Sequence, residues 1–351
     1  MSLDDMVRPE KVAGEVSRLL GVECLEVAPV IGGADPNSRL VRVGLAGEGA
    51  PRQAIYKVYG VAESYRREVG CLGLINGVGD FAPRLLANDD ATQAVLMEFI
   101  EGANLYEVVR RGEASVSLVV EAALRRFAEL HSLAAARAVE CGGWLPCWQA
   151  PDYEWLKAAW QCALAAAAGL KELPVPEPEF SLLAEVLSDQ GGDRTLVLFD
   201  ANPFNLIWQD GSIKFIDFVT ALYGPSWLDL DFVRRALGLS EAEIVAADRK
   251  YLAYRRELGA PVADEEQYLI KVDYWQVASA LLAAQGFQEQ AEGKHQLKPS
   301  LPEELRRHEQ FRNDVLSDVW AICHRRAELH GIAKIMEQVV GEGICVERNR
   351  R

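Results

Sequence analysis

The sequence lacks the long apolar runs and cysteine pairs that mark membrane-spanning and disulfide-rich proteins. No uninterrupted apolar run in its 351 residues approaches the length of about 18 residues that suggests a transmembrane helix, and no signal-peptide pattern precedes the expected fold. The seven cysteines are odd in number and include no Cys-x2-Cys pair, which disfavours a disulfide framework or a zinc site. We therefore expect a soluble protein of the reducing cytoplasm, with no membrane partner.

Basic residues are outnumbered by acidic ones, and histidine is scarce. The chain has 37 Lys and Arg residues against 52 Asp and Glu residues, for a net charge of −15, and its five histidines show no metal-ligand spacing. This balance disfavours a nucleic-acid partner, because no stretch offers a concentrated basic face for phosphates. It is compatible with attraction of a cationic small molecule and equally compatible with plain solubility. The oligomeric state cannot be inferred from the sequence.

The most informative stretch that is present runs from Thr195 to Asp231. It opens with an apolar run, then places Asp200 and, five residues later, Asn205. Two further apolar runs flank the turn at 209–212, whose Asp-Gly pair is typical of a β-hairpin. That hairpin would return the chain so that Asp217 arrives close to both earlier side chains.

Three converging oxygen-bearing side chains suit magnesium and phosphate chemistry. A hard cation prefers one or two carboxylates, an amide oxygen and the phosphate oxygens of its substrate. Phosphoryl transfer also requires a carboxylate placed to accept the proton of the attacking hydroxyl. A hairpin whose Asp and Asn merely make turns explains Asp200-x4-Asn205 alone more simply. The added Ile216-Asp217-Phe218 favours the chemical interpretation.

The pattern Asp-x4-Asn, short hairpin and Ile-Asp-Phe resembles the catalytic loop and metal-binding Asp of the kinase-like fold. Within that fold it is most similar to the aminoglycoside phosphotransferase and choline kinase superfamily. The resemblance implies an α+β, two-lobed protein-kinase-like fold with ATP and Mg²⁺ as cofactors. A small N-terminal antiparallel β-sheet lobe with a helix, at 1–100, would end in the hinge, and a larger, mainly helical lobe would follow at 101–351. Asp200 would be catalytic, and Asn205 and Asp217 would hold the metal.

The resemblance also assigns the first lobe to ATP. Strands are expected at Cys24–Ile31 and Leu40–Leu45, and between them lies a small loop of the form G-G-x-x-x-N-S, although a Gly-rich hairpin turn is common. A lysine on a short apolar strand is most often a solvated edge residue. Here Lys57 lies on the strand expected at Gln53–Tyr59, and Glu68 lies on the helix that follows. Protein kinases use a lysine and a glutamate in these positions to hold the α- and β-phosphates. The residues assigned in this way are Gly32, Gly33, Asn37, Ser38, Lys57 and Glu68, with Glu63 a less favoured partner for the lysine.

Two more strands are expected at Ala82–Leu86 and Gln93–Phe99. The second of them, within AVLMEFIEG, resembles the hinge that binds adenine in this superfamily. The carbonyl of Glu98 and the N–H of Ile100 would then hydrogen-bond to the edge of the adenine ring, and Met97 would lie at the back of the pocket. A buried methionine is usually only filler, so its identity adds little.

The remaining chain is expected to be mainly helical, with one helix over Ser115–Ala136 and another from Pro302 to His330. We expect His131 to pack or hydrogen-bond rather than catalyse. Asp229 matches the Asp of the family's Y-D-L-A motif and would brace the catalytic loop. The pair Ser240 and Glu243 forms the capping box of a further helix.

The acceptor is expected to be a small molecule, because only a turn separates Asp217 from the segment that begins at Pro225. Protein kinases place a long activation segment there, where protein substrates dock. Aminoglycosides, choline-like amines, amino alcohols and sugars all remain open. The chain departs from the family at Leu198-Phe199, where His-Gly is usual, and at Val219, where Gly is usual.

Three functional hypotheses follow. The leading one is an ATP-dependent phosphotransferase, a small-molecule kinase that acts on a hydroxyl. The second is a nucleotide-binding pseudoenzyme or regulatory module with the same fold, which Leu198-Phe199 favours and the retention of Lys57, Asp200, Asn205 and Asp217 disfavours. The third is an unrelated α+β scaffold protein, which Mg-ATP would not stabilise.

Overall fold

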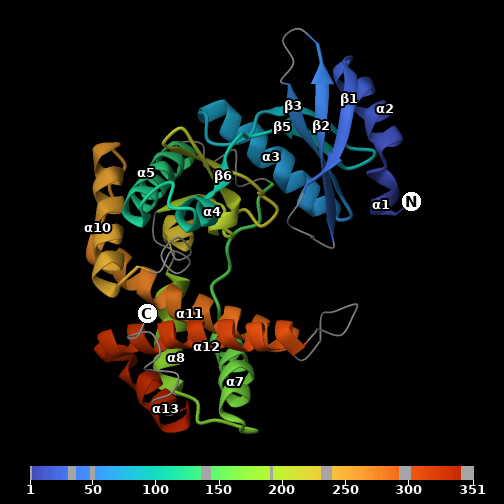
Figure 1. The fold of residues 1–351 in the computed structure, drawn as a ribbon. Coiled ribbons are helices and arrows are strands. Elements are labelled where there is room, and N and C mark those ends of the chain that lie inside the picture. Colours follow the sequence, from blue (N-terminus) through green and yellow to red (C-terminus); the bar gives the residue numbers. More distant parts are fainter. Residues whose placement is uncertain are drawn as a thin grey trace. The chain divides into compact units, whose positions relative to one another are not determined.

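The computed structural model describes most of the chain. The described residues are 2–30, 37–47, 52–135, 144–189, 193–230, 239–291 and 302–340. They belong to two compact units (Figure 1): residues 1–148 with 192–263, and residues 149–191 with 264–351. The division into lobes at residue 100 stays a prediction.

The first unit begins with a five-stranded antiparallel sheet. Its strands, in spatial order, are β1 (Glu23–Pro29), β2 (Ser38–Ala46), β3 (Gln53–Tyr59), β5 (Ala94–Glu98) and β4 (Leu85–Asp89). Alternate β2 residues such as Val41 and Val43 are buried, as a strand with one face on a core requires. They share that core with Val12 and Val16 of α2 (Pro9–Leu20). Helix α3 (Ala62–Val78) also packs on this sheet, against β3, β4 and β5.

The rest of the first unit frames a hairpin. Strands β8 (Leu206–Gln209) and β9 (Ser212–Phe215) are joined by Asp210 and Gly211, whose φ values of 51° and 81° are those of a type I′ turn. The predicted hairpin is therefore confirmed. The other elements are α1 (Leu3–Met6), β6 (Ala103–Asn104), α4 (Leu105–Arg110), α5 (Val116–Ala135), β7 (Arg194–Val197), η1 (Pro203–Asn205), β10 (Leu222–Pro225), η2 (Ser226–Asp229) and α10 (Glu241–Glu257).

The regular elements described in the second unit are all helices. It contains α7 (Tyr153–Ala168), α8 (Glu177–Ser188), α11 (Glu265–Ala291), α12 (Pro302–Arg325), η3 (Ala327–Leu329) and α13 (His330–Val340). Helices α11 and α12 pack along each other (Figure 1), and Trp160 meets Phe180 edge-on at 5.5 Å between α7 and α8. Among the helices described in either unit, none combines the length and apolarity needed to cross a membrane.

Two expected elements differ from the structure. Strand β4 begins at Leu85 instead of Ala82, because Pro83 has no N–H for a ladder and Asn76 bonds both the Pro83 carbonyl and the Leu85 N–H. The expected helix from Pro302 to His330 is broken. Its extended residue Arg326 turns a guanidinium toward Asp273, 2.6 Å away.

The fold class predicted from the sequence is confirmed in its main features. The chain is α+β, with an N-terminal antiparallel sheet of five strands and a mostly helical remainder. The capping box at Ser240 and Glu243 is formed as predicted, at the start of α10. Helix α10 lies beside α5 in the first unit (Figure 1). These two helices support the segment that carries the predicted site, through His131 of α5 and Tyr251 of α10.

Candidate active site

Lys57 lies in the middle of β3 and is nearly enclosed, with 7% of its side chain exposed. Its Nζ lies 2.9 Å from Oδ1 of Asp217 and 3.6 Å from Oε2 of Glu68. The alternative of a solvated edge lysine is wrong, because β3 lies inside the sheet and the ammonium is paired with two carboxylates. Glu63 pairs with Arg67 of its own helix instead. The structure thus brings together the lysine, the helix glutamate and the predicted metal-binding aspartate.

Glu68 ties α3 to the chain that follows Asp217. It is buried, and its Oε2 accepts a hydrogen bond of 3.0 Å from the main-chain N–H of Phe218. Burial raises the pKa of Glu68 above its usual value, and the nearby Lys57 cation opposes that rise. A displacement of α3 would therefore disturb Lys57 and the Asp217 loop together.

Asp200 and Asn205 are joined directly. The Asn205 amide donates to the Asp200 carbonyl (2.9 Å) and to Oδ2 of its carboxylate (3.1 Å). The other carboxylate oxygen accepts a 2.7 Å bond from the amide of Asn202. Asn202, absent from the predicted site, also caps η1 by accepting from the Phe204 N–H. An Asn before Pro is a local signal for such a cap and could have identified it.

The hairpin places Asp217 beside this loop. The Ile216 N–H donates a 3.0 Å bond to the carbonyl of Asn205, just beyond the Leu206–Phe215 pair of the β8–β9 ladder. Asp217 itself has a φ of 64°, in the left-handed region that non-glycine residues seldom adopt. Its side chain is 39% exposed. The sequence prediction that Asp200, Asn205 and Asp217 converge therefore agrees with the backbone path.

The oxygens at this point fit a hard cation. Asn205 uses its amide nitrogen toward Asp200. Among the described residues, its amide oxygen accepts no hydrogen bond, and Asp217 pairs with Lys57 through Oδ1 alone. No group of three or more His, Cys, Asp or Glu side chains in the described part of the chain could hold a metal. A cation here would need further oxygens from its substrate, which is how Mg²⁺ is usually bound with nucleotides.

A buried carboxylate supports the loop that leads to Asp200. Asp229 accepts bonds from the main-chain N–H groups of Leu198 (2.9 Å) and Phe199 (2.8 Å), so the bracing role predicted for it is confirmed. His131 of α5 lies 3.1 Å from the same carboxylate and is buried, as predicted for a hydrogen-bonding residue. Leu198 is itself buried, whereas Phe199 is partly exposed and has a φ of 66°. The two bonds to Asp229 help to hold this unusual backbone.

The support for this loop continues into α10, through residues that no sequence motif identifies. His131 Nδ1 lies 2.8 Å from the Tyr251 hydroxyl, which also accepts a 2.9 Å bond from Arg255. Arg255 reaches Oδ1 of Asp193 at 3.0 Å, just before β7. Burial raises the pKa of Tyr251 to about 12, so its hydroxyl stays protonated at neutral pH. Tyr251 and Arg255 lie one helical turn apart, but His131 and Asp193 are far from them in sequence, and no local motif marks the set.

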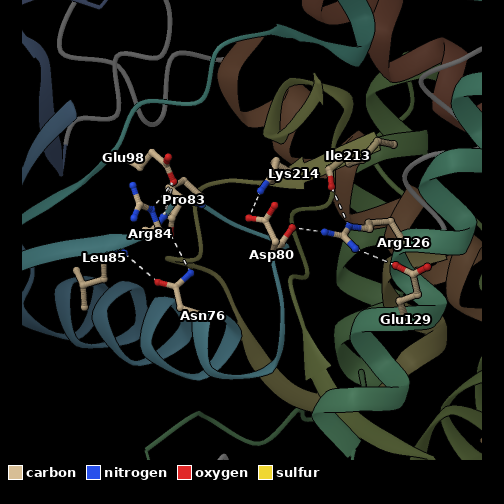
Figure 2. A network of polar contacts seen from close by, with 10 residues as sticks. All are labelled: Asn76, Asp80, Pro83, Arg84, Leu85, Glu98, Arg126, Glu129, Ile213 and Lys214. Atoms are coloured by element: carbon tan, nitrogen blue, oxygen red, sulfur yellow. Dashed lines mark hydrogen bonds and ion pairs between the residues drawn. The ribbon is translucent and has the colours of Figure 1, made fainter. Parts of the chain in front are cut away.

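A second network, also missed by the sequence analysis, fastens the loop between α3 and β4 (Figure 2). Lys214 of β9 pairs with the carboxylate of Asp80, and Arg126 of α5 donates to the Asp80 carbonyl. Arg126 also donates to the Ile213 carbonyl at 3.0 Å and pairs with Glu129. The end of α3 is thereby tied to the hairpin that leads to Asp217.

The predicted nucleotide residues are only partly described. Gly32 and Gly33 lie outside the described residues, while Asn37 and Ser38 precede and begin β2, where the Gly60 N–H donates to the Asn37 carbonyl at 2.7 Å. Met97 is buried in β5. The Glu98 N–H donates to the Arg84 carbonyl at 2.9 Å, and its carboxylate lies 3.3 Å from the Arg84 guanidinium, as Figure 2 shows. Ile100 follows the end of that strand.

Comparison with solved structures shows the kinase-like fold. The macrolide 2'-phosphotransferase MphH of Brachybacterium faecium is similar over 87% of this chain and 97% of its own, with 16% identity and a TM-score of 0.53. A putative aminoglycoside phosphotransferase of Ralstonia eutropha JMP134 matches over 89% and 98%, with 14% identity and a TM-score of 0.57. The choline kinase LicA of Streptococcus pneumoniae matches over 88% and 98%, with 15% identity and a TM-score of 0.52.

No match is found among curated proteins. A family model, however, matches residues 45–260, which is more than half of the chain and includes every described element from β3 to α10. This match contradicts the hypothesis of an unrelated scaffold protein. The matched family is described as the phosphotransferase enzyme family, and the chain belongs to it.

Proposed function

We propose that this chain transfers the γ-phosphate of ATP to a hydroxyl group of a small molecule, with Mg²⁺ as the accompanying ion. The observation that carries the proposal is the pairing of the enclosed Lys57 with Glu68 and Asp217. A lysine enclosed among carboxylates has lost much of its hydration, so it can offer a fixed positive charge to phosphate oxygens. Family membership and the kinase-like neighbours support the same class of reaction.

Each residue has a distinct task in this proposal. Lys57, held by Glu68, positions the α- and β-phosphates. Asn205 and Asp217 hold the magnesium ion, which supplies charge neutralisation on the β- and γ-phosphates when bound. Asp200 accepts or orients the proton of the attacking hydroxyl. Its carboxylate is already oriented by the amides of Asn202 and Asn205, which prepares it for this task.

The other predicted site residues and the lobes complete the proposal. The strand end with Met97, Glu98 and Ile100 would hold adenine, and Asn37 and Ser38, with Gly32 and Gly33 outside the described residues, would cover the phosphates. The ATP-binding lobe would occupy residues 1–100 and the catalytic lobe residues 101–351, in a cytoplasmic protein. The acceptor would be a small molecule, such as an aminoglycoside, an amino alcohol or a sugar-like compound.

A second candidate function is a nucleotide-binding pseudoenzyme. The observation that favours it is the unusual catalytic loop, where buried Leu198 and left-handed Phe199 replace the family's His-Gly. Such a module would bind Mg-ATP without transferring phosphate. The intact hydrogen bonds of Asp200 and Asn205 favour the enzyme instead.

Product analysis separates the two candidates. The full chain is incubated with Mg-ATP and a library of hydroxyl-bearing metabolites, aminoglycosides and macrolides, and mass spectrometry detects any compound that gains a phosphoryl group. We expect at least one acceptor to be phosphorylated by the wild type. Asp217→Ala should abolish the product, and Lys57→Ala should weaken it. Asp210→Asn is the matched control, because an Asn-Gly pair suits the turn at that position.

Two results would contradict the proposal. Binding of Mg-ATP without a product from any acceptor would leave the pseudoenzyme as the better account. An unchanged melting temperature in millimolar Mg-ATP would remove the nucleotide site altogether.

A further inference from the structure

An aromatic side chain from outside the sheet presses on the outer face of α3. The ring of Trp144 lies against Gly70 so closely that a Cβ atom built on Gly70 would sit 2.5 Å from Trp144 Cζ3. Only glycine allows this approach. Trp144 is 39% exposed and forms one wall of a hollow of about 460 Å³ over the same helix face. Glu68, two residues before Gly70, is buried on the inner face.

The segment that carries Trp144 is fixed at its other end. The Trp148 N–H donates to the Tyr223 carbonyl at 3.0 Å, and the Tyr223 N–H donates to the Pro146 carbonyl at 2.9 Å, so residues 144–148 are hydrogen-bonded to β10. The Trp148 ring is buried and meets Trp227 edge-on at 5.2 Å. This short segment is therefore a rigid extension of β10, and we call it the 144–148 strap.

Strand β10 belongs to the framework of the candidate site. It pairs with β7, whose chain continues into Leu198 and Asp200, and it follows the Asp217 loop directly. The Thr220 hydroxyl donates to the Leu198 carbonyl at 3.0 Å, which joins the two loops next to this strand. The strap thus connects the outer face of α3 to the backbone that positions both aspartates.

We propose that the 144–148 strap holds α3 in place, with Trp144 as a positioning residue for Glu68. The inner face of α3 has its own tie to the Asp217 loop, through Oε2 of Glu68, which accepts a hydrogen bond from the Phe218 N–H (3.0 Å). Trp144 contacts the helix from the opposite side. The helix is therefore held between two contacts, one with the Asp217 loop and one with the strap that is bonded to β10. The effect on ATP chemistry rests on the proposed function, whereas the mechanical contact does not.

A matched pair of glycines makes the proposal testable. Gly70 and Gly73 lie on the same helix and both border the hollow, but a Cβ on Gly73 would meet nothing within 4 Å. Replacement by alanine changes helix propensity equally at both positions. A difference between Gly70→Ala and Gly73→Ala therefore reports the contact with Trp144.

The experiment compares the wild type with Gly70→Ala, Gly73→Ala, Trp144→Ala, Trp144→Phe and the double variant Gly70→Ala/Trp144→Ala. The first measurement is amide hydrogen exchange of α3 in the ligand-free chain. We expect faster exchange in Gly70→Ala, Trp144→Ala and the double variant, an intermediate rate in Trp144→Phe, and the wild-type rate in Gly73→Ala. Helix α3 of the double variant should exchange no faster than α3 of the more affected single variant, because both substitutions remove the same contact.

The second measurement is ATP turnover, either transfer to an identified acceptor or ATP hydrolysis. Gly70→Ala and Trp144→Ala should lower kcat by about 10- to 100-fold, as displaced catalytic groups do, with a smaller change in the dissociation constant of Mg-ATP. Gly73→Ala should turn over like the wild type. If the wild type does not respond to Mg-ATP, the proposed function fails while hydrogen exchange still decides on the strap.

The strap proposal is overturned if Gly70→Ala and Gly73→Ala exchange alike, or if the effects of Gly70→Ala and Trp144→Ala on exchange add in the double variant. Faster exchange of α3 with an unchanged kcat would also overturn it, because Trp144 would then stabilise the helix without positioning Glu68.

Discussion

Two aspartates near the loop that carries Asp200 have opposite surroundings. Asp229 is 1% exposed, and both of its oxygens accept main-chain hydrogen bonds from Leu198 and Phe199. Asp217 is 39% exposed, adopts a left-handed backbone and contacts Lys57 through one oxygen. A buried, fully bonded carboxylate holds structure, whereas a half-exposed carboxylate beside a cation retains an oxygen for a ligand.

The same contrast extends to their neighbours. Asp229 belongs to a buried chain of contacts that continues through His131 and Tyr251 to Arg255. Asp200, like Asp217, is half-buried, and among the residues that the structure describes its carboxylate is held only by two amides of its own loop. The comparison therefore predicts that substitutions at the half-buried Asp200 and Asp217 affect turnover. Substitutions in the buried network around Asp229 should affect stability instead.

The largest expected effect belongs to Asp200. Asn has nearly the same size but cannot accept a proton, and general-base assistance is worth about 10²- to 10⁴-fold, or roughly 3–5 kcal/mol of barrier. Asp200→Asn should lower kcat by that factor on any identified acceptor and leave the Mg-ATP thermal shift nearly unchanged. Asp210→Asn should have no effect on either. Normal turnover by Asp200→Asn would remove Asp200 from the chemistry.

The next effect is the response to metal and nucleotide. Selective binding to the folded state stabilises it by about 2.7 kcal/mol at a hundredfold excess over Kd, so Mg-ATP should raise the melting temperature clearly. ATP with a chelator should raise it less, because Asn205 and Asp217 act through the ion. Asp217→Asn should lose most of the difference between the two conditions. An equal shift with and without magnesium would contradict the assignment of these two residues to the metal.

The part of the site that is local in sequence was predictable, and the part that depends on distant packing was not. The Asp-Gly turn predicted the hairpin, because two consecutive residues with positive φ need those residue types. For residues as far apart as Lys57 and Asp217, no local signal was available, and the family resemblance alone predicted that they belong to one site.

Other features have no local signature in the sequence. Tyr251 reaches His131 across 120 residues, and Trp144 selects glycine at position 70 by a close approach that only the folded chain reveals. Strand β4 was placed too early because its hydrophobic signal began in the buried loop at Phe81 and Ala82, where Pro83 prevents ladder bonding.

A smaller effect, on stability rather than turnover, is expected at Asp229. Asp229→Asn replaces one acceptor oxygen with an NH₂ group, so the N–H of Leu198 or Phe199, or the His131 ring, loses its partner. A buried donor left without a partner costs about 1–3 kcal/mol. Urea unfolding should show a loss of that size. Asp217→Asn should change the free energy of unfolding by less. A larger loss in Asp217→Asn than in Asp229→Asn would contradict the distinction between a structural Asp229 and a ligand-binding Asp217.

The smallest effect tests how far the buried network extends. The Tyr251 hydroxyl lies 2.8 Å from His131 Nδ1 and 2.9 Å from Arg255, but Arg255 keeps its bonds to Asp193 and to the Ala260 carbonyl when that hydroxyl is removed. Tyr251→Phe should therefore lower the free energy of unfolding by about 1 kcal/mol, the net value of a typical hydrogen bond.

The matched control for Tyr251 is Tyr254→Phe on the same helix, whose hydroxyl donates to the half-exposed Glu121 at 3.0 Å and should matter less. Neither variant should alter the thermal shift with Mg-ATP, since neither hydroxyl lies among the residues proposed to bind it. Equal losses of unfolding free energy in Tyr251→Phe and Tyr254→Phe would show that the buried hydrogen bonds of Tyr251 stabilise the fold no more than the half-exposed one of Tyr254. Asp229 would then hold the catalytic loop without support from α10.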